Sequence, residues 1–100
     1  MSIPAEAIRR EDRLNGGRYS FAFGDGSEAE MIYVADGPDS AIITHTYTPP
    51  QHRGQGTAAA LVARAVADFR AEGRKVTPSC WFARQEFRSH PEWSDLLATR

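Results

Sequence analysis

The stretch TPPQHRGQGTAAALVARAV, residues 48–66, constrains the fold more than any other part of the chain. A β-branched run ends at two prolines, which cannot continue a strand ladder. Gly54 and Gly56 then stand two residues apart, and an alanine-rich segment begins at Thr57. This order predicts a strand that passes through a glycine loop directly into a helix.

The segment after the loop has helical periodicity. Apolar residues recur at intervals of three and four over residues 57–72, and Gly73 is placed to end a helix. Residues 74–80 then predict a further strand. A strand, a helix and a strand with short connections predict a parallel, right-handed βαβ unit.

Upstream of the loop, the sequence indicates three strands joined by turns. Aromatic residues alternate with smaller ones in residues 18–23, and residues 28–34 and 40–48 form two more strand-like segments. Gly24-Asp25-Gly26 and Asp36-Gly37-Pro38-Asp39 separate them. This part of the chain therefore predicts an antiparallel meander.

The two ends of the chain are less regular. Residues 1–15 are polar and are expected to form a loosely held arm or a short helical turn, whereas residues 82–97 predict helix with a break at His90-Pro91. We therefore predict one α+β domain over residues 1–100. Its mixed sheet consists of an antiparallel meander followed by a parallel βαβ unit, with helices packed on the sheet.

Composition excludes several classes of protein. No apolar run approaches the roughly 20 residues needed to span a membrane, and the N-terminus does not resemble a signal peptide. Cys80 is the only cysteine, so we expect no disulfide, no metal site and a cytoplasmic location. A net charge of −1 argues against nucleic acid as a partner. Residues 51–100, which contain the loop, are nevertheless net positive, which would suit an anionic ligand.

The glycine loop is suited to hold phosphate. A helix start carries unpaired N–H groups and partial positive charge, and glycines let phosphate approach them closely. A Walker loop is excluded because no lysine follows Gly56. A dinucleotide fingerprint would need a third glycine where Ala59 stands and a longer parallel sheet. A glycine-assisted turn without a ligand is the remaining alternative.

Three blocks of sequence together resemble a known family. Gln-x-x-Gly-x-Gly after a strand resembles the pyrophosphate motif of the GNAT superfamily of acyl-CoA-dependent N-acetyltransferases. "HTYTPPQHRGQGTAAALVARAV", "GRKVTPSCWF" and "RSHPEWSDLL" resemble its small, about hundred-residue subfamily. The resemblance implies a GNAT-like fold in which the strands on either side of the helix splay apart and admit acetyl-CoA. The cofactor-binding residues would be Thr46, Tyr47, Thr48, Gln51, His52, Arg53, Gly54, Gln55, Gly56 and Thr57.

Two residues are candidates for the chemistry. An amine must be neutral to attack a thioester, although a lysine-type amine has a pKa of about 10.4. His45 could accept the proton, directly or through water; the alternative is a half-buried histidine bonded to its neighbours. Cys80 could contact the acetyl group, position the thiol or form a transient acetyl-cysteine; the alternative is inert packing. We favour direct attack in a ternary complex.

The chain departs from larger relatives in two ways. Phe82 and Phe87 stand where those enzymes commonly carry a tyrosine as general acid, and the helices that wall their acceptor site are missing. The resemblance therefore implies an open acceptor site for a protein lysine, an N-terminus or a small amine. The alternative is a non-catalytic module that binds coenzyme A or acyl-CoA as a sensor or interaction domain.

Overall fold

The computed structural model describes residues 3–98, and five strands in these residues form one sheet. The strands are β1 (Arg9–Arg13), β2 (Gly16–Ala22), β3 (Glu28–Ala35), β4 (Ser40–Tyr47) and β5 (Lys75–Pro78). Their order in the sheet is β1-β2-β3-β4-β5. Neighbours from β1 to β4 are antiparallel, and β4 and β5 are parallel. The predicted meander and parallel crossover are confirmed.

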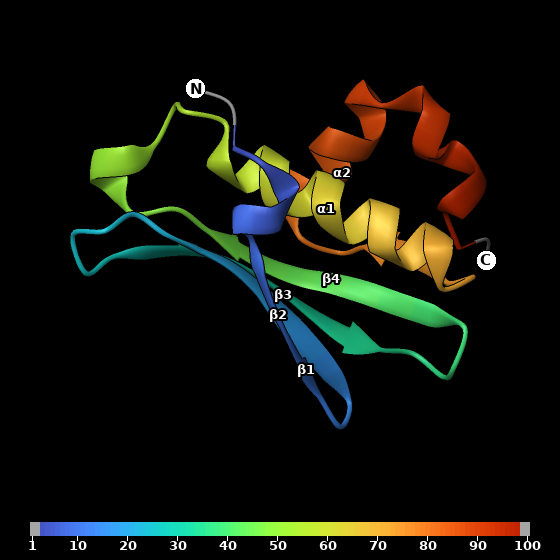
Figure 1. Ribbon diagram of the computed structural model, residues 1–100. Coiled ribbons are helices and arrows are strands. Elements are labelled where there is room, and N and C mark those ends of the chain that lie inside the picture. Colours follow the sequence, from blue (N-terminus) through green and yellow to red (C-terminus); the bar gives the residue numbers. More distant parts are fainter. Residues whose placement is uncertain (1–2, 99–100) are drawn as a thin grey trace.

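The helices leave one face of the sheet open. α1 (Thr57–Ala71) connects β4 to β5, and α2 (Trp81–Ser89) follows β5. Figure 1 shows both on the same side of the sheet. Three short 3-10 helices complete the chain: η1 (Ala5–Ala7), η2 (Pro50–His52) and η3 (Pro91–Leu96). None of the helices in the described part is long and apolar enough to cross a membrane.

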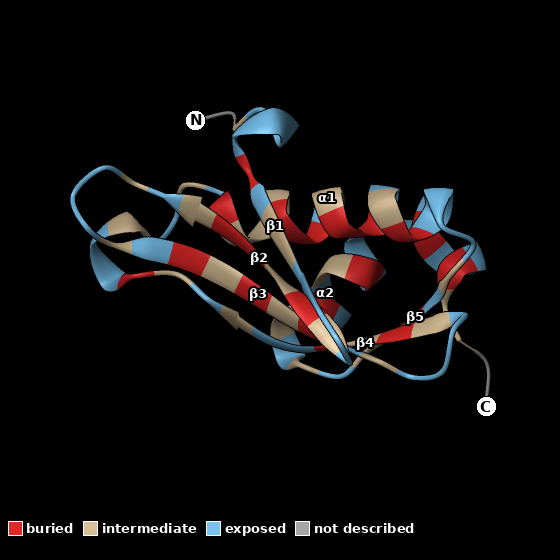
Figure 2. Cartoon of the chain, turned by 60° about the horizontal axis from the view of Figure 1, so that its bottom comes forward, coloured by how far each residue is buried: buried red, intermediate tan, exposed pale blue. Residues whose placement is uncertain are grey.

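The core lies between the sheet and α1. Buried residues alternate along the strands and recur along one side of α1 (Figure 2). This agrees with the periodicities of two and 3.6 that the sequence shows. The largest fully buried apolar side chains are Tyr19, Phe69, Met31, Ile43, Leu61, Val62 and Val76.

The expectation for residues 1–15 was wrong in one respect. η1 is the short helical turn, but residues 9–13 are not a loose arm: they pair with β2 as the edge strand β1. All five residues of β1 are charged, so it has no apolar alternation to reveal it. Residues 1 and 2 lie outside the described residues.

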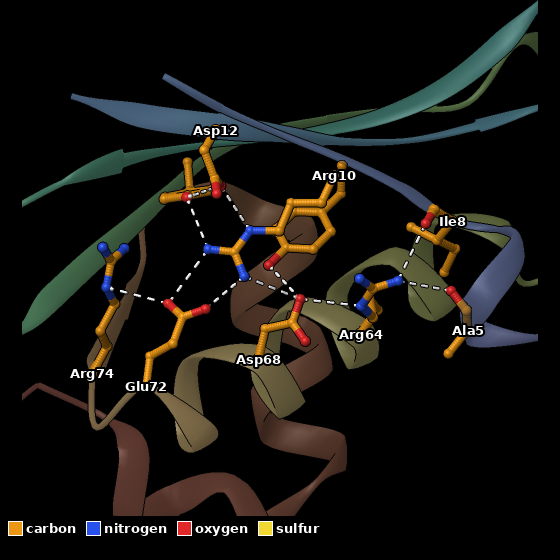
Figure 3. Close-up of polar contacts among 10 residues, drawn as sticks. Ala5, Ile8, Arg10, Asp12, Arg64, Asp68, Glu72 and Arg74 are labelled. Carbon is orange, nitrogen blue, oxygen red and sulfur yellow. Dashed lines mark hydrogen bonds and ion pairs between the residues drawn. The ribbon is translucent and has the colours of Figure 1, made fainter. Parts of the chain in front are cut away.

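Arg10 attaches β1 to α1. Its guanidinium donates to Asp12 at 2.8 Å, to Asp68 at 3.2 Å and to Glu72 at 2.6 Å (Figure 3). Tyr19 Oη donates to the same Asp68 carboxylate at 2.9 Å. These contacts raise the pKa of Arg10, with the hydrogen bond to Glu72 as the main cause. A charged network therefore holds the edge strand in place.

The C-terminal segment has the predicted break. α2 ends at Ser89, and η3 begins at Pro91. The ring of Trp93 stacks on His90 and packs against Phe87 at the bend. The chain then returns to the sheet, where the N–H of Ala98 donates to the carbonyl of Val76 in β5.

Candidate functional site

β4 and β5 separate part-way along their length. They pair over residues 40–43 of β4, although β4 continues to Tyr47. The N–H groups of Ser79 and Cys80 both donate to the carbonyl of Ile43, at 3.0 and 3.2 Å, and the chain then turns into α2. Within the described residues, no strand pairs with the last part of β4 on this side. The backbone of β4 is therefore open to a ligand here.

A β-bulge in β4 lies at the point of separation. The register with β3 shifts between Ile32 and Tyr33, whose partners are His45 and Ile43. Thr44 is thus the extra residue on β4. A bulge bends and twists its strand, which favours divergence from a neighbour.

A cleft of about 520 Å³ occupies the space beside the end of β4. The glycine loop, the first turn of α1 and the start of α2 all contribute to its lining. Its lining residues are Thr46, Tyr47, Thr48, His52, Arg53, Gly54, Gly56, Thr57, Ala58, Ala59, Trp81, Phe82 and Glu86.

The glycine loop exposes the start of α1. Gly54 and Gly56 have φ angles of +83° and +80°, a left-handed conformation that side chains disfavour. A Cβ atom at either position would meet no atom within 4 Å, so the space over the loop is open. Gly56 is the N-cap and provides no side-chain cap, and in the described structure the N–H groups of residues 57–59 have no acceptor. The Oγ1 atom of Thr57 is buried and has no hydrogen-bond partner among residues 3–98.

His52 joins the loop to the β2–β3 hairpin. Its Nε2 atom lies 2.9 Å from the carboxylate of Asp25, and its ring stacks on Phe23 with centroids 3.8 Å apart. Asp25 also accepts hydrogen bonds from Ser27. Hydrogen bonds from Ser27 and His52 hold the pKa of Asp25 well below its usual range. The hairpin tip thus braces the loop, a contact that the sequence analysis missed.

His45 lies on the open face of the sheet. It pairs with Ile32, whereas its neighbour Thr46 pairs with the buried Met31 and lines the cleft. The His45 side chain is 53% exposed, and its Nε2 atom lies 3.3 Å from Oε2 of Glu30. His45 therefore flanks the separation of the strands from outside the cleft.

Cys80 does not end a strand, contrary to the range predicted for it. β5 ends at Pro78, and Cys80 is the N-cap of α2, with its Sγ atom accepting the N–H of Ala83 at 3.4 Å. Proline cannot donate to the ladder, which explains the early end of β5. The backbone N–H of Cys80 still binds Ile43, so Cys80 lies where the two strands part.

The comparison with known families agrees with this geometry. The sequence model of a family described as GCN5-related N-acetyl-transferase matches residues 18–96. The chain belongs to this family. Its members share acetyl transfer as the general activity and this type of mixed sheet. A search of curated proteins found no match.

In this GCN5-related N-acetyltransferase domain, eight of the predicted cofactor-binding residues line one cleft. They are Thr46, Tyr47, Thr48, His52, Arg53, Gly54, Gly56 and Thr57. Gln51, Gln55, His45 and Cys80 are outside that lining. Trp81 and Phe82 also line this cleft, and Trp81 is 68% exposed.

Sequence reasoning missed three other cleft residues and one neighbour of the site. The three cleft residues are Ala58, Ala59 and Glu86, and Glu86 lies one turn after Phe82 on α2. Phe82 and Glu86 are four residues apart on a predicted helix, and this spacing could have placed Glu86 on the same side of the helix as Phe82. Glu30 beside His45 could not be foreseen, because the bulge that sets their register has no mark in the sequence.

Proposed function

We propose that this chain is an acetyl-CoA-dependent N-acetyltransferase, which transfers an acetyl group to an amine by direct attack in a ternary complex. One observation supports this most strongly: the open edge of β4 leads into a cleft that ends at the unpaired amides of α1. Such a cleft offers an extended binding edge and an anion site in series.

The start of α1 would hold the pyrophosphate of coenzyme A. The N–H groups of residues 57–59 are unpaired, and they lie at the positive end of the helix dipole. The buried hydroxyl of Thr57 has no partner in the described part of the chain and can donate to a phosphate oxygen. Arg53 adds positive charge at the cleft. These donors fit a diphosphate.

The pantetheine arm would lie along β4. Residues 46–48 line the cleft, and Trp81 and Phe82 give it an apolar part of its wall. An extended amide-containing chain can pair with a free strand edge as an added strand would. The apolar wall then covers the arm and excludes water.

His45 and Cys80 flank the point where β4 and β5 part. Bound acetyl-CoA supplies the acetyl group as a thioester. We assign to His45 the proton of the attacking amine, so that the N–C bond forms as the C–S bond breaks. Cys80 fixes the start of α2 at the point where the strands part. The acceptor is a protein lysine, an N-terminus or a small amine.

A non-catalytic module that binds coenzyme A is the second candidate. Phe82 favours it, because a phenyl ring on the cleft wall cannot protonate a departing thiolate as the tyrosine of larger relatives does. Turnover distinguishes the two functions.

Calorimetric titration with coenzyme A tests the cleft. We expect Gly54→Val and Gly56→Val to weaken binding at least tenfold, about 1.4 kcal/mol, because each fills the space over the loop and strains the backbone. Gly37→Val is the matched control, since Gly37 has a φ of +76° in a turn remote from the cleft. Unchanged affinity in the loop variants would refute the phosphate site.

Acetyl-CoA turnover with a panel of amines tests the chemistry. Turnover should fall in His45→Ala and Cys80→Ala while coenzyme A still binds. A wild-type protein that binds coenzyme A but acetylates no amine would establish the sensor instead. Mass spectrometry of natively purified protein would show whether coenzyme A copurifies or Cys80 is acetylated.

A further inference from the structure

Glu30 and His45 form a side-chain pair on the open face of the sheet. Glu30 lies in β3 and His45 in β4, and the bulge at Thr44 brings His45 opposite Ile32. Oε2 of Glu30 and Nε2 of His45 are then 3.3 Å apart. Contacts of catalytic groups are often this long before substrate binds and shorten in the complex.

The Glu30 carboxylate is held in its orientation by Arg18. Nε of Arg18 donates to Oε1 of Glu30 at 2.7 Å, and Oε2 is the oxygen that lies 3.3 Å from the imidazole. The Arg18 guanidinium also donates to Glu28 at 2.7 Å and to Glu11 at 3.2 Å. These carboxylates raise the pKa of Arg18, with Glu28 as the main cause, so the guanidinium remains charged. Glu30 is thus fixed at one oxygen and available at the other.

This geometry defines the roles of the two imidazole nitrogens. In a neutral imidazole one nitrogen donates and the other accepts. A carboxylate beside Nε2 favours the proton on that atom, and Nδ1 is then the nitrogen with a lone pair. When Nδ1 takes a proton, the imidazolium gains the attraction of the adjacent carboxylate, as in a catalytic triad.

We propose that Glu30 is a positioning residue, which orients His45 and stabilises the imidazolium that forms when Nδ1 takes the proton of the acceptor amine. The inference rests on the proposed function of His45. Glu30 takes no proton in this step, and the proton leaves from His45 to solvent after transfer. The acceptor amine would accordingly approach over the open face of the sheet.

The test compares Glu30→Gln with Glu28→Gln. Glutamine keeps the size of Glu30 and removes its charge. Glu28 is the matched control, because it lies on the same strand and contacts the same Arg18, but its carboxylate does not contact His45. Thermal melting of both variants would verify the fold.

Glu30→Gln should lower kcat at least tenfold and leave the affinity for coenzyme A unchanged, whereas Glu28→Gln should retain most of kcat. The acidic limb of the kcat/KM profile should shift in Glu30→Gln to lower pH, since an imidazolium that forms during turnover loses a neighbouring anion. Arg18, Glu11 and Glu28 also face this pair, and they are unchanged in that variant.

The His45 ring provides a readout that does not require turnover. Its NMR titration should move to lower pH in Glu30→Gln. If wild-type protein turns over, and neither kcat nor the His45 titration changes in Glu30→Gln, the role of Glu30 is overturned while the proposed function stands. If wild-type protein acetylates no amine, both are overturned.

Discussion

At the scale of single residues, Cys80 shows how one side chain can serve the fold and the site together. Its Sγ atom caps α2, and its backbone N–H binds Ile43 where the strands part. Its thiol is therefore committed to a structural contact with Ala83 before any chemistry is considered. A loss of activity in Cys80→Ala would not by itself demonstrate a covalent role.

Cys80→Ser separates these contributions. Serine is a better N-cap than alanine, so Cys80→Ser should keep the stability of the wild type, while Cys80→Ala should lose about 1 kcal/mol of unfolding free energy. Direct attack predicts that Cys80→Ser retains most turnover. Urea denaturation and acetyl-CoA kinetics of both variants measure this, and an inactive but stable serine variant would point to an acetyl-cysteine intermediate.

At the scale of elements, periodicity and turn chemistry predicted most of the fold. The alternation in β2, the apolar stripe of α1 and the glycine loop were readable because each reflects which side chains are buried. β1 was missed because charged residues form it, and its place depends on the partners of Arg10 far along the chain. The cleft residues of the loop could be predicted, whereas the bulge at Thr44 could not.

The β2–β3 hairpin supports the glycine loop through the contact of Asp25 with His52. A variant without this contact tests the role of the hairpin. Asp25→Ala should weaken coenzyme A binding several-fold, because His52 then loses the carboxylate that contacts its Nε2 atom and the loop is less well ordered. Stability should change little, since Asp25 is exposed. Asp39→Ala, in the β3–β4 turn, is the control in the same titration. Equal affinities of the two variants for coenzyme A would show that the contact between Asp25 and His52 has no role in binding.

At the scale of the whole molecule, ion pairs distribute charge over both faces of the sheet and the helix surface. Hydrogen bonds from Arg10 and Arg18 hold the pKa values of Asp12 and Glu28 below their ordinary values of 3.8 and 4.5. Such carboxylates stabilise the folded state above their unfolded pKa, and this contribution is lost as the pH falls through the folded pKa. The fold should therefore be sensitive to acid.

The melting temperature should fall by several degrees once the pH drops below about 4.5. Arg10→Met should be less stable at neutral pH and should show a smaller fall in acid, because Asp12 has lost its cation. Arg13→Met is the control, since Arg13 is exposed in the same strand and the described structure gives it no ion pair. Calorimetry between pH 7 and pH 3 measures these differences, and a wild-type melting temperature that is flat to pH 3 would contradict the argument.

The composition of β1 also has a consequence for how the protein behaves at high concentration. β1 is one border of the sheet, and its five residues are all charged. A charged border strand is a poor template for strand addition by another molecule. The opposite border, β5, is covered by the returning C-terminal segment, where Leu97 bridges Val76. The charges that make β1 hard to recognise as a strand from the sequence thus also protect the sheet against aggregation.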